Sequence, residues 1–182
     1  MSCTIKEPMK QSLSAAEIFG NPQFRAISYG GFRGASLEQC PTVEELKEDM
    51  LVLNAMGIKL IRTYKTQKTE HAKRLLQAIR ELKKEAPDFE MYAMLGVWIE
   101  CSGAFTDNPD HTMEDEVENT AEINEAIRLT NEYPDIVKTI AVGNEAMVHW
   151  ATSYFVGPEV ILKWVNYLIH RRIDGKLPKD LW

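Results

Sequence analysis

Four short apolar runs, each followed by a longer segment with a helical period, constrain the fold of this chain more than any other feature. The runs span residues 24–30, 58–64, 90–99 and 137–144. They are nearly continuous in apolar residues, as strands buried on both faces are, and the segments that follow them are amphipathic. This repetition predicts an α/β fold in which helices cover a parallel sheet.

The segments between the runs carry the signals that begin and end helices. Thr42 with Glu45 three residues later predicts a capping box, and Gly57 predicts the left-handed residue that ends the same helix. Pro158 suits the first turn of the last helix. A long polar loop is expected at residues 101–114, before the third of these helices.

The spacing of the runs narrows the fold further. Strand starts at residues 24, 58, 90 and 137 lie 34, 32 and 47 residues apart, and a complete eightfold barrel of about 250 residues has about 31 residues per βα unit. About four units therefore predict the N-terminal half of a (β/α)8 TIM barrel, with residues 24–182 as a partial barrel domain and residues 1–23 as a leader helix and loop. Because residues 175–182 resemble a connection to a fifth strand, we expect a fragment or a truncated reading frame.

A complete four-stranded sandwich of the flavodoxin-like kind is the alternative fold. Five strands are more usual in that fold, and its phosphate-binding loop is absent. The glycine pair Gly30 and Gly31 matches neither the dinucleotide fingerprint nor the P-loop. The half-barrel is therefore the fold that we expect.

Composition limits the partners and the compartment. The formal charge of −6 argues against nucleic acid, which requires clustered Lys and Arg. No apolar stretch approaches the roughly 20 residues that cross a bilayer, and the start of the chain lacks the apolar core of a signal peptide. We therefore expect no membrane partner and, for the chain as written, a cytoplasmic location, while the compartment of a longer parent stays open. The three cysteines match no metal or redox spacing and are expected to be free thiols.

Acid, aromatic and amide side chains follow the predicted strands. In a parallel sheet the carboxyl ends of the strands form one rim, where functional groups gather. These groups are Tyr29, Tyr64, Trp98, Glu100, Asn144 and Glu145. The set suits a sugar, because aromatic rings contact the apolar face of a pyranose and glycosidic cleavage requires a pair of carboxylates.

Glu145 ends the most informative of the runs. A charged side chain directly after a strand of weakly polar and apolar residues is costly to desolvate, so its position needs a reason. General acid catalysis is one reason, because a partly buried carboxyl keeps its proton more readily. Capping of the next segment or pairing with a lysine is the structural alternative, and spacing alone does not choose between them.

Three short motifs resemble glycoside hydrolase family 17, the β-1,3-glucanases and related β-1,3-glucan-modifying enzymes. The motifs are Ala-Val-Gly-Asn-Glu at residues 141–145, Ile-Ser-Tyr-Gly at 27–30 and Ile-Arg-Thr-Tyr at 61–64. The resemblance covers nearly all of the chain after residue 23 and implies a (β/α)8 barrel that cleaves with retention. It implies that Glu145 is the acid/base residue.

Carried over residue by residue, the resemblance also assigns sugar contacts. Asn144 would bind a hydroxyl beside the cleaved bond, and Tyr29 and Tyr64 would line the same subsite. In this family the nucleophilic Glu lies on a late strand of the C-terminal half and has no counterpart here. Because a retaining mechanism needs the second carboxylate about 5–5.5 Å from the first, this chain alone is expected not to turn over substrate by the family route.

The remaining candidates are open to more than one interpretation. Glu100 could serve as the partner carboxylate, although hydrogen bonding to sugar or pairing with Arg62 is expected instead. Trp98, Trp150 and Tyr154 are either sugar platforms or packing residues. No pair of histidines has the spacing of metal ligands, so we expect no metal, and nothing in the sequence predicts a cofactor.

The sequence as a whole predicts a retaining β-glucan glycoside hydrolase or transglycosylase that carries the acid/base half of its site, with an oligo- or polysaccharide as partner. A non-catalytic carbohydrate-binding half-barrel is the alternative, and an unrelated α/β module with a structural Glu145 is a third hypothesis. An open half-barrel also exposes sheet edges and an apolar face, which predicts self-association.

Overall fold

The computed structural model describes residues 13–36 and 39–182. Four parallel strands form its main sheet in the order β1-β2-β3-β6. Each strand pairs with the strand of the preceding or the following βα unit. These strands are β1 (Arg25–Ser28), β2 (Ile58–Arg62), β3 (Tyr92–Val97) and β6 (Val137–Val142). The predicted α/β class is confirmed. The order runs in one direction without the reversal that a flavodoxin-like sheet has, so the alternative fold is not supported.

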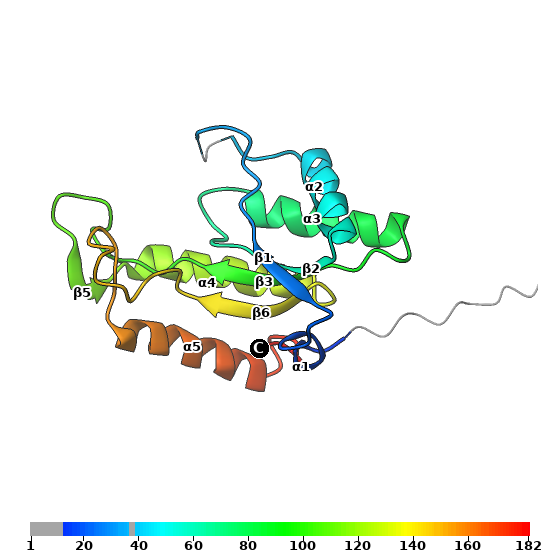
Figure 1. The fold of residues 1–182 in the computed structure, drawn as a ribbon. Helices are drawn as coiled ribbons and strands as arrows, with labels where there is room; N and C mark the ends of the chain where they lie inside the picture. Colours follow the sequence, from blue (N-terminus) through cyan, green and yellow to red (C-terminus); the bar gives the residue numbers. More distant parts are fainter. Residues whose placement is uncertain (1–12, 37–38) are drawn as a thin grey trace, which may run out of the picture.

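Helices cover one face and the flanks of the sheet. Figure 1 shows α4 behind β3 and β6, with α2 and α3 above the sheet and α5 below it. The main core lies between these helices and the sheet. The bounds of these helices are α2 (Val43–Ala55), α3 (His71–Glu85), α4 (Glu116–Glu132) and α5 (Pro158–Ile173). No helix in the described ranges is long and apolar enough to cross a membrane.

The local signals act as the sequence predicts. The Thr42 amide donates to the Glu45 carboxylate over 2.8 Å, and the Glu45 amide donates to the Thr42 hydroxyl over 3.2 Å. Gly57 has a φ of +82° directly after the end of α2, a conformation that favours glycine. Pro158 begins α5 in its first turn.

The expected polar loop at 101–114 is wrong in part, because it contains a short antiparallel pair. β4 (Cys101–Ser102) pairs with β5 (Asp110–Glu114). Contacts distant in sequence hold this hairpin: the Cys101 amide donates to the Tyr154 carbonyl over 3.2 Å, and the Trp164 indole donates to the Glu114 carboxylate over 2.7 Å. Such contacts leave no periodic pattern in the sequence.

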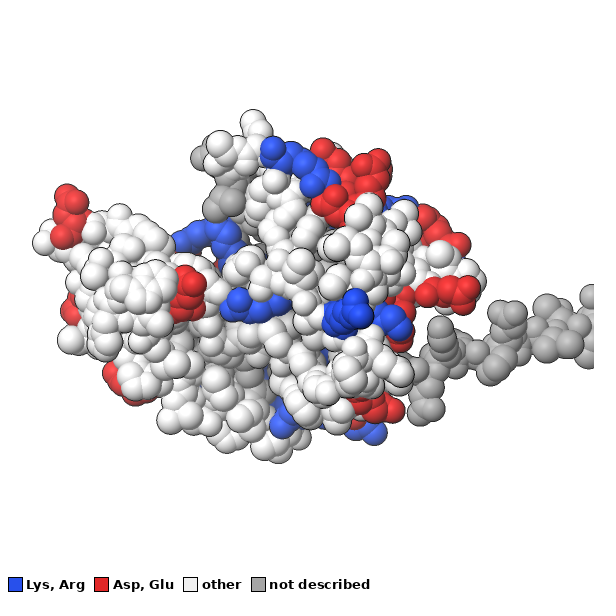
Figure 2. Space-filling view, in the orientation of Figure 1, with Lys and Arg blue, Asp and Glu red and all other residues white. Residues whose placement is uncertain are grey.

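The face of the sheet opposite the helices is partly covered by the leader. α1 (Ala15–Ile18) places Ile18 against Leu60 and Tyr92, and Phe24 packs on the same cluster. β1 stays exposed along its whole length. Figure 2 shows that the face in view is mostly uncharged, with scattered Lys and Arg across its middle and Asp and Glu mainly toward its margins. Because Ile18 and Phe24 cover part of it, the uncovered area of this sheet face is smaller than a bare half-barrel would present.

The outer edge of β6 is paired with Trp182. The Trp182 amide donates to the Lys138 carbonyl over 3.1 Å, and the Ile140 amide donates to the Trp182 carbonyl over 2.9 Å. These two bonds on either side of Thr139 are the pattern of a parallel strand pair. Trp182 thus occupies the place where a fifth parallel strand was expected.

Candidate active site

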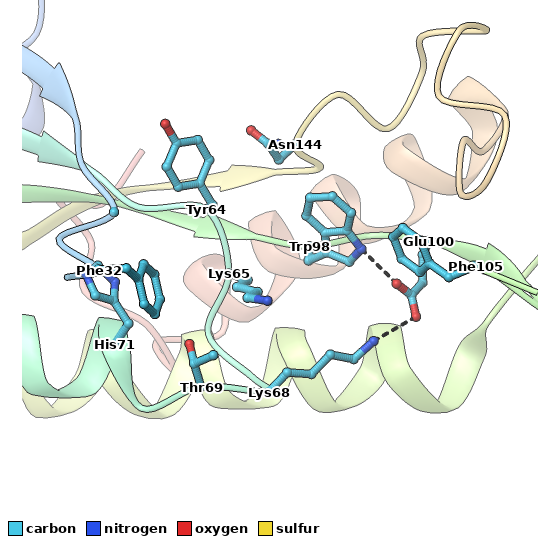
Figure 3. Close-up of a pocket in the computed structure, with 11 residues that line it drawn as sticks. Phe32, Tyr64, Lys65, Lys68, Thr69, His71, Trp98, Glu100, Phe105 and Asn144 are labelled. Atoms are coloured by element: carbon cyan, nitrogen blue, oxygen red, sulfur yellow. Dashed lines mark hydrogen bonds and ion pairs between the residues drawn. The ribbon is translucent and has the colours of Figure 1, made fainter. Parts of the chain in front are cut away.

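A cavity of about 370 Å³ opens at the carboxyl ends of β2 and β3. Figure 3 shows Phe32, Tyr64 and His71 on one side of it and Trp98 and Phe105 on the other. Lys65, Lys68, Thr69, Glu100 and Asn144 also contribute to its lining. Four of the site residues predicted from the sequence, namely Tyr64, Trp98, Glu100 and Asn144, therefore meet at one cavity.

The turn after β6 places Asn144 and Glu145 on the rim. Gly143 leaves the strand with a φ of +80°, and a Cβ there would lie 2.8 Å from the Ile161 side chain. Glu145 follows with a φ of +53°, a left-handed conformation that is uncommon for residues other than glycine and is often found at functional sites. The expectation of a partly buried Glu145 is wrong, because this turn carries its side chain out to an exposed position.

Within residues 13–36 and 39–182, Asn144 and Glu145 each have one polar side-chain contact. Arg62 donates to Asn144 Oδ1 over 2.7 Å, and the Tyr154 hydroxyl donates to Glu145 Oε2 over 3.4 Å. Glu145 forms no ion pair with any other described residue, so the lysine alternative finds no support there. The Tyr154 ring lies 4.8 Å from that of Trp98, and this contact links Glu145 to the wall of the cavity.

Glu100 is almost fully buried, with both carboxylate oxygens in use. The Trp98 indole donates to Oε2 over 2.8 Å and the Lys68 ammonium donates to Oε1 over 3.1 Å, as the dashed lines in Figure 3 mark. The expected pairing with Arg62 is wrong, because Arg62 bonds to Asn144 instead. Glu100 thus fixes the orientation of the Trp98 ring.

Two buried polar side chains of α4 hold the rim loops, and sequence reasoning missed both. Asn119 accepts from the Glu100 amide and donates to the Glu100 carbonyl, each over 3.0 Å. Glu122 accepts from the amides of Thr66 and Gln67 over 2.8 and 3.2 Å, and burial raises the pKa of this carboxyl. The only sequence signal is that polar residues interrupt the buried face of a helix.

Tyr29 and Trp150 lie outside the cavity. The Tyr29 hydroxyl donates to Asp49 on α2, and burial together with this carboxylate raises the pKa of Tyr29. The Trp150 side chain is 68% exposed in the loop after Glu145. Neither residue contributes to the lining of the cavity.

Within the described residues, no three His, Cys, Asp or Glu side chains lie close enough together to hold a metal ion. Cys40 and Cys101 are free thiols, as expected, whereas Cys3 lies outside the described residues. The arrangement offers aromatic faces, an amide and an exposed carboxylate on one rim, a combination that can bind a sugar and donate a proton.

The chain is similar to an endo-laminarinase from Formosa Hel1_33_131, known from its crystal structure. The TM-score is 0.90 and the sequence identity is 54%. The match covers 93% of this chain and 43% of the other, so this chain spans less than half the length of that protein. No protein-family model and no curated protein matches the chain.

Proposed function

We propose that this chain supplies the acid/base side of the active site of a retaining β-1,3-glucan hydrolase or transglycosylase of glycoside hydrolase family 17. The similarity to an endo-laminarinase over 93% of the chain carries this proposal, because laminarin is a β-1,3-glucan. The motif at residues 141–145 and the position of Glu145 beside an aromatic cavity agree with it.

Glu145 is the acid/base residue in this proposal. Its exposed carboxyl on the rim is free to reach the oxygen of a glycosidic bond, and Tyr154 orients it from one side. Asn144 binds a neighbouring hydroxyl: Arg62 occupies its side-chain oxygen, and its amide N–H groups are left to donate to sugar.

Aromatic rings bind the faces of the glucose units. Tyr64 and Trp98 line opposite sides of the cavity, and Glu100 holds the Trp98 indole by its edge so that its face stays available. Trp150 is an additional platform farther along the chain of sugars. Tyr29 supports the rim by packing and does not contact the sugar through its hydroxyl, because that hydroxyl is bonded to Asp49.

The nucleophile in this proposal comes from outside the chain. In the described part of the chain, Glu100 is the other carboxylate that closely follows a strand of the main parallel sheet, and its two oxygens already bind Trp98 and Lys68. The remainder of a (β/α)8 barrel would supply the second carboxylate at about 5–5.5 Å. The sequential parallel order of the sheet and the parallel pairing of Trp182 with β6 agree with a half-barrel.

A non-catalytic carbohydrate-binding half-barrel is the alternative. It is favoured by the hydrogen bonds of Glu100 to Lys68 and Trp98, because they occupy both oxygens of the second carboxylate. Whether catalytic or not, the half-barrel is expected to self-associate through the open face of its sheet and the exposed strand β1. A single monomeric peak in sizing chromatography with cooperative melting would rule out that association.

Reducing-sugar release from β-1,3-glucan by the purified chain, beside a Glu145→Gln variant, tests the proposal, together with calorimetric binding of laminaripentaose. Binding without turnover in either protein is the expected result. Turnover that disappears in the variant would mean that Glu100 or a second copy supplies the nucleophile. Absence of both binding and turnover would refute a β-glucan function.

A further inference from the structure

Two residues that line one end of the cavity each carry a buried side-chain atom without a hydrogen-bond partner in the described part of the chain. The atoms are Thr69 Oγ1 and His71 Nε2, and both residues line the cavity. Thr130 Oγ1 and Arg171 Nε are also unpartnered, but neither residue lines the cavity. Because an unpaired buried polar atom is costly, two of them at one cavity point to a ligand group that pairs with them.

The chemistry of this pair suits uncharged hydroxyl groups. Burial lowers the pKa of His71 to about 4, so at neutral pH its imidazole carries one N–H donor and one acceptor nitrogen. The Thr69 hydroxyl both donates and accepts. In Figure 3 the Thr69 hydroxyl points up from its loop toward the space beside Phe32 and Lys65, across the cavity from Asn144.

We propose that Thr69 and His71 form a polar subsite that binds the hydroxyl groups of one glucose unit of the glucan. This inference rests on the proposed function and adds a binding position on the opposite side of the cavity from Asn144. In Figure 3 the Tyr64 ring lies on the same side of the cavity as Asn144, and in this proposal it packs on the face of the same sugar chain.

Phe32 packs beside this subsite. Its ring stacks on the His71 imidazole with 5.1 Å between centroids, and the two unpartnered atoms are shielded from solvent. Phe32 belongs to residues 29–33, which form neither helix nor strand. In this proposal the Phe32 ring turns aside when the sugar binds, a movement that breaks no helix or strand.

Two matched substitutions distinguish the loss of a ligand contact from the general effect of removing an unpaired buried hydroxyl. Thr69→Val and Thr130→Val each replace an unpartnered buried hydroxyl by a methyl group of similar shape. Titration calorimetry of the full chain with laminaripentaose is expected to give an affinity on the order of tenfold weaker for Thr69→Val and for His71→Phe. Thr130→Val is expected to bind as the wild type does, and thermal unfolding confirms that each variant is folded.

The outcomes are distinct for the two proposals. Equal affinity of the wild type, Thr69→Val and His71→Phe would overturn the subsite, with water as the partner of the two atoms, and leave the proposed function intact. Should His71→Phe fail to fold, Thr69→Val against Thr130→Val decides alone. Failure of the wild type to bind laminaripentaose would overturn the proposed function and the subsite with it.

Discussion

The buried imidazole of His71 makes the stability of the fold depend on pH. Burial against the rings of Phe32 and Tyr29 lowers its pKa from 6.5 to about 4, because the charged form loses its hydration there. The folded pKa lies below the unfolded one, so between these two values the unfolded chain binds more protons. The contribution of His71 to the free energy of unfolding is therefore fully present above the unfolded pKa of 6.5, and it is lost as the pH falls toward 4.

The size of the effect follows from the two pKa values. Between about pH 7 and about pH 4.5, His71 is expected to remove roughly 2 kcal/mol of unfolding free energy. Carboxylates also titrate in this range, so the loss is measured as a difference between the wild type and His71→Phe, which keeps an aromatic ring and removes the titration.

Urea unfolding followed by circular dichroism at the two pH values gives both free energies. The wild type is expected to lose about 2 kcal/mol more than His71→Phe, and the surface variant His170→Gln controls for the loss of one imidazole. Equal losses in the wild type and His71→Phe would refute the assignment of a buried, neutral imidazole.

Three further changes test the local structure. Thr42→Ala removes the cap of α2 and is expected to cost about 1 kcal/mol in urea unfolding, whereas an unchanged midpoint would show that the cap contributes nothing. Gly96→Ala places a Cβ 2.2 Å from the Thr63 carbonyl oxygen and is expected to lower the melting temperature through a loss of about 1–3 kcal/mol or more; wild-type melting would contradict this close approach. Glu122→Ala leaves the amides of residues 66–67 without their acceptor, so hydrogen exchange there should accelerate while the amides of β3 stay protected; retained protection would show that the loop needs no such support.

Much of the fold could be predicted because its signals are local. The run at 90–99 contains β3 and the run at 137–144 contains β6, each with ends shifted by a few residues. The capping box at Thr42 and the glycine at 57 act within a few residues of themselves, so they are visible in the sequence. The hairpin of β4 and β5 was missed because residues about 50 positions away hold it.

The site could be predicted only in part. Alternation along strands and the position of strand ends bring Tyr64, Trp98 and Asn144 to one rim, as expected. The exposure of Glu145 depends on a left-handed backbone, and the hydroxyl of Tyr29 depends on a partner in a separate helix, so neither follows from sequence spacing. The supports on α4 and the unpaired atoms at the cavity become visible only when distant segments are packed together.

We propose above that this chain carries the acid/base half of a β-1,3-glucanase site. A chimera in which this chain replaces the matched 43% of the endo-laminarinase from Formosa Hel1_33_131 tests that proposal most directly, through reducing-sugar release from laminarin. The chimera is expected to hydrolyse laminarin, and its Glu145→Gln variant is expected to lose about a hundredfold or more in rate while still binding the glucan. A folded chimera without activity, or a Glu145→Gln chimera as active as its parent, would contradict the proposal.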